Sequence, residues 1–194
     1  MQPLAINFDD LKKLNRHFII QNSLDFKNSN PKKQTISAFR ANLIDKNPKC
    51  KAEIQKISEK QIKTIANILL KYINNYEDLK SLEFLFIHPN ITKDGFEKYV
   101  ESQSIILDQI PFTLDYLIKI LDENNNLKGE EINRKCSEYL YEKRNKLQHR
   151  DVFKLLKFCL TGTNAKFTIE ELFEILGKEK FKERLQKIQN ILNK

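Results

Sequence analysis

Three cationic residues near the C-terminal end of the chain recur at helical spacing. Arg150, Lys154 and Lys157 stand at positions i, i+4 and i+7, so in a helix they share one face. The opposite face is apolar and consists of Val152, Leu155, Leu156 and Cys159. Guanidinium and ammonium groups bind phosphate oxygens. The pattern predicts a helix with a buried face and a basic face, which either binds a polyanion or is simply solvated.

Candidates for catalytic or metal chemistry are few. The chain has three histidines, His17, His88 and His149, and three cysteines, Cys50, Cys136 and Cys159. No histidine has a cysteine, aspartate or second histidine at metal-ligand spacing, so none receives a catalytic role. An odd number of cysteines without a C-x-x-C pair indicates neither a zinc knuckle nor a disulfide framework. We therefore expect no metal and no cofactor, and Cys136 and Cys159 to be small core residues.

The positive charge is concentrated at the two ends of the chain. The formal net charge is +8, which divides into +6 for residues 1–52, −5 for residues 53–142 and +7 for residues 143–194. One interpretation is a solvated surface. The other is that two basic patches meet in the fold and bind a polyanion.

Length and composition favour a helical globular protein. A chain of 194 residues can bury a sizeable core, and no apolar run approaches the roughly 20 residues that a membrane-spanning helix needs. Only 4 glycines and 5 prolines are present, whereas sheet-rich or loop-rich folds need many turn residues, above all glycines that tolerate positive φ. We expect an all-α fold, no secretory or transit leader, and a reducing compartment.

Apolar residues at a 3.6-residue period predict the helices. The clearest is a single helix over 53–73. Shorter helices are expected over 8–20, 34–45, 77–86, 94–108, 112–123 and 130–145. Polar segments rich in turn-forming residues separate them at 28–31, 88–90 and 124–126.

The helix ends are most sharply indicated after residue 150. Gly162 is suited to end the first helix, because glycine adopts the left-handed conformation without a steric penalty. Thr168 and Glu171 form the T-x-x-E pattern of a capping box, and Gly177 is suited to end the helix that follows. A last helix from about residue 178 is expected to bury Phe181, Leu185, Ile188 and Leu192. Its cationic residues Lys178, Lys182, Arg184 and Lys187 are expected to face mainly solvent.

The C-terminal third resembles a known family. The stretch DVFKLLKFCLTGT from Asp151, the stretch ELFEILGKE from Glu171, and Glu183-Arg184-Leu185 follow one another. This order is similar to the C-terminal anticodon-binding region of glutamyl-tRNA synthetases of the class I, bacterial and mitochondrial type. There, a helix ending in Leu-Arg-x-Ala-Leu-Thr-Gly precedes a helix ending in Leu-Leu-Gly-Lys-Glu and then an Arg-Leu pair.

Weaker similarities at 8–16 and 84–90 extend the resemblance over nearly the whole chain. It implies one compact helical bundle over 1–194, with a helical subdomain over 1–90 and a second over 91–194 that carries the strongest match. Two departures stand out. Lys157 replaces the usual arginine, and Lys166-Phe167 replaces a Gly-Pro in the loop that lies near the anticodon in the family.

The resemblance, taken with the basic face, implies a set of nucleic-acid-binding residues. They are Arg16, Arg150, Lys154, Lys157, Thr161, Lys166, Phe167, Lys178 and Arg184. The cations would neutralise phosphates, and exposed aromatics such as Phe167 or Tyr141 would stack on unpaired bases.

Catalytic motifs of the family are missing from these 194 residues. The class I core holds ATP with an H-x-G-H-type motif and a K-x-S-K-S-type loop, and neither occurs. The four glycines lie singly, so they form no phosphate-binding loop. We expect no aminoacylation activity.

Two functions fit these observations. The first is a noncatalytic module that binds tRNA or another structured RNA, alone or beside a separate catalytic chain. The alternative is a structural subunit of a large mitochondrial assembly, such as a ribosome, an ATP synthase or a respiratory complex, in which the old RNA face meets a protein partner. The expected location is the mitochondrion, or otherwise the cytoplasm.

Overall fold

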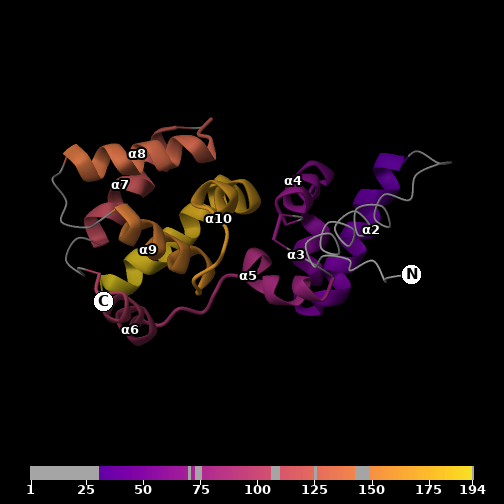
Figure 1. The fold of residues 1–194 in the computed structure, drawn as a ribbon, viewed down its shortest axis with the longest axis horizontal. Coiled ribbons are helices and arrows are strands. Elements are labelled where there is room, and N and C mark those ends of the chain that lie inside the picture. Colours follow the sequence, from indigo (N-terminus) through magenta and orange to yellow (C-terminus); the bar gives the residue numbers. More distant parts are fainter. Residues whose placement is uncertain are drawn as a thin grey trace, which may run out of the picture. The chain divides into compact units, whose positions relative to one another are not determined.

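The chain is helical in two compact units (Figure 1). The computed structural model describes residues 31–69, 71–72, 76–105, 110–124, 126–142 and 149–193. The units are Met1–Ile87 and His88–Lys194, whereas the sequence suggested one unit with subdomains meeting at residue 90. No strand occurs in the described ranges, which confirms the predicted all-α fold. The helix expected over 8–20 and the similarity at 8–16 lie outside them.

The first unit consists of short helices around a small apolar core. Its elements are α2 (Pro31–Lys46), the 3₁₀ helix η1 (Pro48–Cys50), α3 (Lys51–Lys56), α4 (Glu59–Leu69), the 3₁₀ helix η2 (Tyr76–Leu82) and α5 (Glu83–Phe86). The core includes Leu43, Ile54, Ile65, Leu69, Leu79 and Leu85. Asn47 is buried with them, and its amide Nδ2 donates to the carbonyl oxygens of Leu43 and Leu79, both at 3.0 Å. This side chain therefore joins α2 to η2.

The single helix predicted over 53–73 was wrong. Ile57 has extended backbone, with φ −70° and ψ 132°, and separates α3 from α4. Arg40 of α2 donates from Nη2 to the Ile57 carbonyl oxygen at 2.7 Å, and the Ser58 hydroxyl accepts from the Gln61 amide at 3.2 Å. A serine that caps a new helix competes with continuation of the old one. A contact from a distant helix and a local cap together divide the expected helix.

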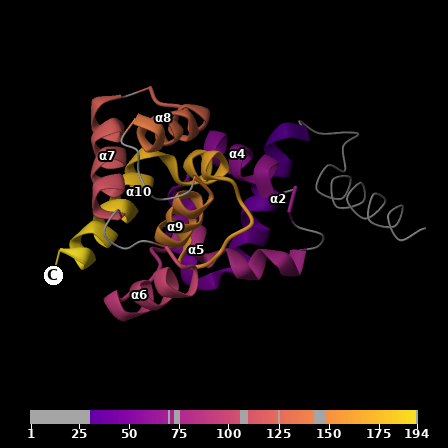
Figure 2. The ribbon, with the colours of Figure 1, turned by 60° about the vertical axis from the view of Figure 1, so that its left-hand side comes forward.

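The second unit is built around one long C-terminal helix. Its elements are α6 (Lys93–Ser102), α7 (Ile110–Glu123), α8 (Gly129–Glu142), α9 (His149–Thr161) and α10 (Ile169–Leu192). α10 packs against α7, α8 and α9, and Figure 2 shows it running between them. The shared core includes Leu114, Leu121, Ile132, Cys136, Leu155, Leu172, Leu185 and Ile188. α10 thus packs against the three helices α7, α8 and α9.

Local signals located the helix ends after residue 150 correctly, but not the end of α6. Gly162 follows α9 with φ 70°, and Gly177 has φ 75° and kinks α10. The capping box is present, because the Glu171 amide donates to Thr168 Oγ1 at 3.1 Å and the Thr168 amide donates to Glu171 Oε2 at 3.0 Å. α6 ends at Ser102, earlier than the predicted residue 108, and Ser104 there has φ 54°.

The predicted core role of the second unit's cysteines is confirmed. Cys136 and Cys159 are both buried. Burial raises the pKa of Cys136 to about 12 and also raises the pKa of Cys159, so both thiols stay protonated at neutral pH. In the described ranges, no helix combines the length and the apolar character needed to cross a membrane.

Gly129 allows α8 to approach α10 closely, and this contact can be tested. A Cβ at this position would lie 2.9 Å from the Cα and the carbonyl oxygen of Glu170. Gly129→Ala is therefore expected to push the start of α8 away from α10 and to lower the free energy of unfolding by about 1–3 kcal/mol. Urea denaturation measures the change, and the exposed neighbour Lys128→Ala is the control. A Gly129→Ala protein as stable as the wild type would contradict the close contact.

Candidate nucleic-acid interface

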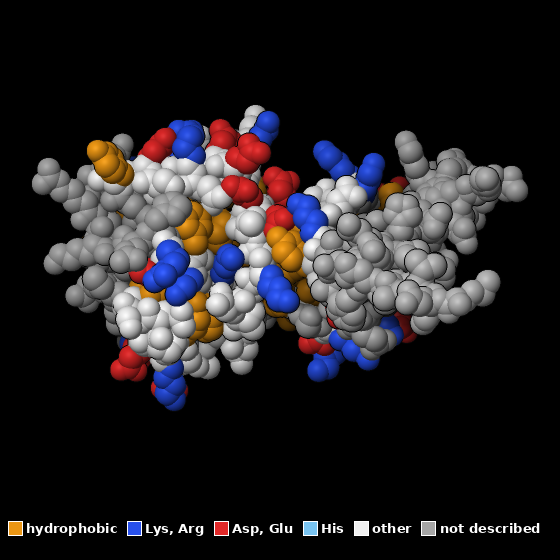
Figure 3. Space-filling view, in the orientation of Figure 1, with side chains coloured by type: hydrophobic (Ala, Val, Ile, Leu, Met, Phe, Trp, Pro, Cys, Tyr) orange, Lys and Arg blue, Asp and Glu red, His pale blue; other side chains and the backbone are white. Residues whose placement is uncertain are grey.

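α9 has the two faces that its sequence predicted. Val152, Leu155, Leu156 and Cys159 are fully buried. On the other side, Arg150 is exposed and Lys154 and Lys157 are half-exposed. Figure 3 shows Lys and Arg side chains over α9. We call Arg150, Lys154 and Lys157 the α9 basic face.

α6 fixes the orientation of α9. The Tyr99 ring of α6 stacks on Phe158 of α9, with ring centroids 3.9 Å apart and planes 6° apart. The Tyr99 hydroxyl donates to the Lys154 carbonyl oxygen at 3.2 Å. Burial raises the pKa of Tyr99, so this hydroxyl keeps its proton at neutral pH. Because one turn of α9 is held by a ring and a hydrogen bond, its basic face has a fixed direction.

The charges of this face are largely unneutralised. Arg150 pairs with its chain neighbour Asp151, with Nε to Oδ1 at 3.7 Å. Within the part of the chain that the structure describes, no carboxylate lies within salt-bridge distance of Lys154, Lys157 or the exposed Lys166. Some other cations of the unit have carboxylate partners within 4 Å: Lys98 with Asp94, Lys119 with Glu123, Arg134 with Glu138, and Lys187 with Glu183. α9 differs in that three cations share one helix face, which favours an anionic ligand there.

Negative charge lies on other helices of the unit. The first turns of α8 and α10 carry Glu130, Glu131, Glu170 and Glu171. In Figure 3, red acidic side chains lie over α8 and the first part of α10, with some blue ones among them, and blue side chains lie over α9. These carboxylates occupy the helix N-termini that would otherwise attract phosphate. The field of the unit thus favours a polyanion on α9 and disfavours one on α8.

Thr161 is a structural residue at the C-terminal end of α9, and its predicted contact with RNA was wrong. It is buried, and its hydroxyl lies 2.7 Å from the Lys157 carbonyl oxygen and 2.8 Å from that of Thr163. It also accepts from the Thr163 amide at 3.2 Å. These bonds hold the last turn of α9 and the start of the loop, so the hydroxyl is not available to a ligand.

Arg184 does not face solvent, contrary to the prediction. Only 2% of its surface is exposed, and its Nη1 donates to the carbonyl oxygen of Leu160. That carbonyl is in the last turn of α9, where backbone oxygens lack helical partners and a cation is favourable. Burial lowers the pKa of Arg184 to about 10, so the guanidinium is still charged at neutral pH. Arg184 caps α9 from α10.

Removing this cap is expected to destabilise the second unit. Arg184→Met keeps most of the side-chain volume but leaves the Leu160 carbonyl without its charged donor, which costs about 2–3 kcal/mol. Thermal or chemical denaturation measures the loss. Lys187→Met, on the half-exposed face one turn further along α10, should change stability by no more than about 0.5 kcal/mol. Equal effects of the two substitutions would show that Arg184 is not a cap.

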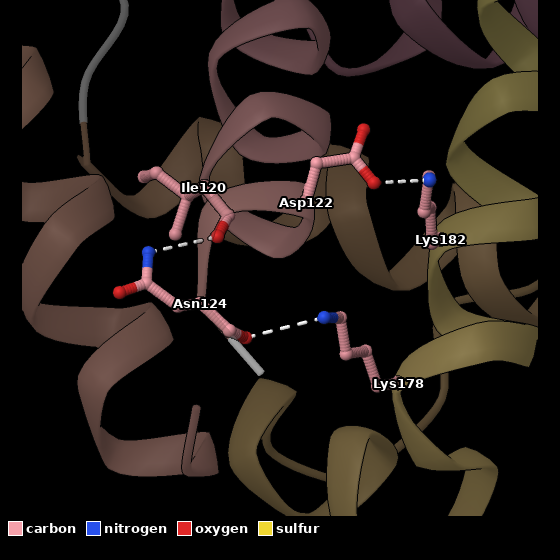
Figure 4. A network of polar contacts seen from close by, with 5 residues as sticks. All are labelled: Ile120, Asp122, Asn124, Lys178 and Lys182. Atoms are coloured by element: carbon pink, nitrogen blue, oxygen red, sulfur yellow. Dashed lines mark hydrogen bonds and ion pairs between the residues drawn. The ribbon is translucent and has the colours of Figure 1, made fainter. Parts of the chain in front are cut away.

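Lys178 joins α10 to α7 (Figure 4), and its predicted contact with RNA stays a prediction. Its Nζ donates to the Asn124 carbonyl oxygen at 3.2 Å, and the Asn124 amide donates to the Ile120 carbonyl at 2.9 Å. Lys182, one turn further, pairs with Asp122. Both lysines thus lie at the C-terminal end of α7, where a helix attracts cations. No local pattern indicates these pairs, because they join helices far apart in the chain.

Phe167 is buried, so the prediction of an exposed stacking aromatic was wrong at this position. Only 4% of its surface is exposed. Tyr141 on α8 is 87% exposed and remains available to a base. Arg16 lies outside the described residues. Among the described residues, the α9 basic face, the exposed Lys166 and the half-exposed Lys178 therefore remain of the predicted site.

A helical unit in which three cations share one face of α9 defines a helical domain suited to a polyanionic ligand. Residues 10–189 match the family described as the anticodon-binding domain. The chain belongs to this family, which comprises anticodon-binding domains of tRNA synthetases. No curated protein matches the chain significantly.

Proposed function

We propose that this chain binds the anticodon arm of a tRNA through the α9 basic face and does not itself aminoacylate. The observation that carries the proposal is the positive charge that Arg150, Lys154 and Lys157 place on one face of a helix anchored by Tyr99, with Asp151 beside Arg150, in a chain of the anticodon-binding family. Arg150 and Lys157 are separated by about 10 Å along the helix, so the face can contact several phosphates of one strand.

Phosphate contacts fix the position of the RNA but do not read its sequence. The α9 basic face therefore does not select among anticodon sequences, and that selection must come from groups that contact the bases. The similarity of 151–185 to glutamyl-tRNA synthetases makes a glutamate tRNA anticodon arm the first ligand to test. Other anticodon arms serve as comparisons.

The noncatalytic part of the proposal rests on the motifs. These 194 residues contain neither the H-x-G-H-type motif nor the K-x-S-K-S-type loop. We expect the purified chain to exchange no pyrophosphate into ATP and to charge no glutamate onto tRNA. Either activity above a mock preparation would contradict this part of the proposal, whereas stimulation of a separate catalytic chain would agree with it.

A salt titration tests RNA binding. Fluorescence anisotropy of a labelled anticodon arm is measured between about 50 and about 200 mM salt. Four neutralised phosphates at a slope of roughly −0.7 to −0.9 each predict a loss of affinity of on the order of 10²-fold over this range. No binding at the low end, or affinity indifferent to salt, would argue against the proposal.

A further inference from the structure

Two aromatic side chains of the second unit are well exposed but stand beside carboxylates. Phe112 on α7 is 61% exposed and Tyr141 on α8 is 87% exposed. Phe112 stands three residues before the exposed Asp115, and Tyr141 stands three residues after the exposed Glu138. Residues three apart are neighbours on a helix surface. A negatively charged group therefore lies beside each of these rings and disfavours the phosphates of an RNA strand there.

Phe153 on α9 has cations as neighbours instead. It stands three residues after Arg150 and four residues before Lys157, so its ring borders the α9 basic face. The carboxylate that pairs with Arg150 belongs to Asp151. Asp151 is two residues before Phe153 and therefore projects from nearly the opposite side of the helix. The surroundings of Phe153 thus combine an aromatic ring with positive charge.

The position of Phe153 on α9 explains why it is half-buried. At roughly 100° per residue, it falls between the buried side of the helix, which includes Leu156, and the side that carries the cations. The stacking contact with α6 lies elsewhere, because Phe158, which stacks on Tyr99, is about 140° further round the helix. One part of the Phe153 ring is held against the core, and another part is exposed beside the cations.

An aromatic ring beside cations suits an unpaired nucleotide. Cations bind the phosphates of the strand, and the ring stacks on a base. A helix face that is only solvated, or that binds only phosphates, needs polar side chains at its border, whereas Phe153 exposes part of an apolar ring there. The anticodon arm offers unpaired bases in its loop.

We propose that Phe153 is a base-stacking platform, on which one unpaired base of the RNA strand held by the α9 basic face stacks. The inference rests on the proposed function and adds to it a contact with a base, which phosphate contacts do not provide. Every base has an aromatic face, so stacking tolerates all four. Phe153 therefore selects unpaired over paired nucleotides and does not select one anticodon over another.

A fluorescent substitution tests the proposal. Phe153→Trp places a reporter in the platform, because the chain contains no tryptophan. The glutamate tRNA anticodon arm, added at low salt, should quench the emission strongly, because stacking on a base quenches indole fluorescence. Phe112→Trp, beside Asp115, is the matched control and should be quenched little. Equal quenching in the two variants, or none at position 153 although the arm binds, would overturn the inference.

The affinity of Phe153→Leu is a second measurement. Leucine keeps an apolar side chain against the core but removes the ring, so affinity for the arm should fall by about 5- to 100-fold with an unchanged salt slope. Affinity for a fully paired RNA duplex of the same length should not change. Circular dichroism shows whether the variant is folded. A folded Phe153→Leu chain with wild-type affinity for the arm, or with equal losses for arm and duplex, would mean that Phe153 only packs the helix.

The inference and the proposed function fail in different ways. Binding of the arm with the expected salt dependence, but without the quenching and the loss of affinity at Phe153, overturns the inference while the proposed function stands. If the arm binds nowhere on the chain at low salt, the proposed function fails and the inference fails with it.

Discussion

Replacing Arg150, Lys154 and Lys157 together by glutamine is expected to weaken binding of the anticodon arm by on the order of 10²-fold at about 0.1 M salt. Each cation lost removes a contribution of roughly 0.7–0.9 to the slope of log affinity against log salt, so the slope should flatten by about 2–3. Anisotropy titrations across salt measure both quantities. The fold should persist, because the buried face of α9 is unchanged.

A matched control separates the α9 basic face from net charge. Lys98, Lys119 and Arg134 pair with Asp94, Glu123 and Glu138 on α6, α7 and α8. Their triple glutamine variant removes the same formal charge from other surfaces. We expect only a few-fold loss of affinity, because long-range attraction is screened beyond about 10 Å at this salt. Equal losses in the two variants would refute a localised site.

Phe167→Ala is expected to lower the free energy of unfolding by about 3–5 kcal/mol, as for other buried phenylalanines. The ring is 4% exposed, so its removal leaves a cavity under the loop rather than a missing base platform. Chemical denaturation measures the change. RNA affinity, measured where the variant is still folded, should stay close to the wild type.

Tyr141→Ala is the matched aromatic control. Tyr141 is 87% exposed, and its removal should change stability by no more than about 0.5 kcal/mol. If Tyr141 stacks on a base, the variant should instead lose about 1–3 kcal/mol of RNA binding. A Phe167→Ala protein with wild-type stability and reduced RNA affinity would reverse the two assignments and restore the predicted role of Phe167.

Features encoded within a few residues were predictable from the sequence. The capping box needs only Thr168 and Glu171, and the end of α9 needs only Gly162. The two faces of α9 follow from residue spacing alone, because apolar residues recur on one side of the helix and cations on the other. The division of α3 from α4 was not predictable in this way, because Arg40 reaches Ile57 from another helix.

Two errors in the site had signals that could have prevented them. Arg184 stands three residues after Phe181 and four before Ile188, which places it on the buried face of α10 despite its charge. Phe167 precedes the cap Thr168, and Leu172 is the fourth residue of the helix, the two positions of a hydrophobic staple. Both are buried. Spacing was the better guide there than residue type.

The contacts of Lys178 had no such signal. Its partners belong to the end of α7. Which helices meet depends on the packing of the whole unit, and a single sequence does not encode that packing in any local pattern.

RNA is expected to lie on α9 rather than on the acidic helix α8, and NMR shift mapping with the anticodon arm shows which helix it contacts. The arm is added to the ¹⁵N-labelled chain at low salt. The largest shifts should come from Arg150, Lys154, Lys157 and Lys166 and should fade as salt is raised. Shifts concentrated on α8 around Glu130–Glu138, with α9 unchanged, would contradict it.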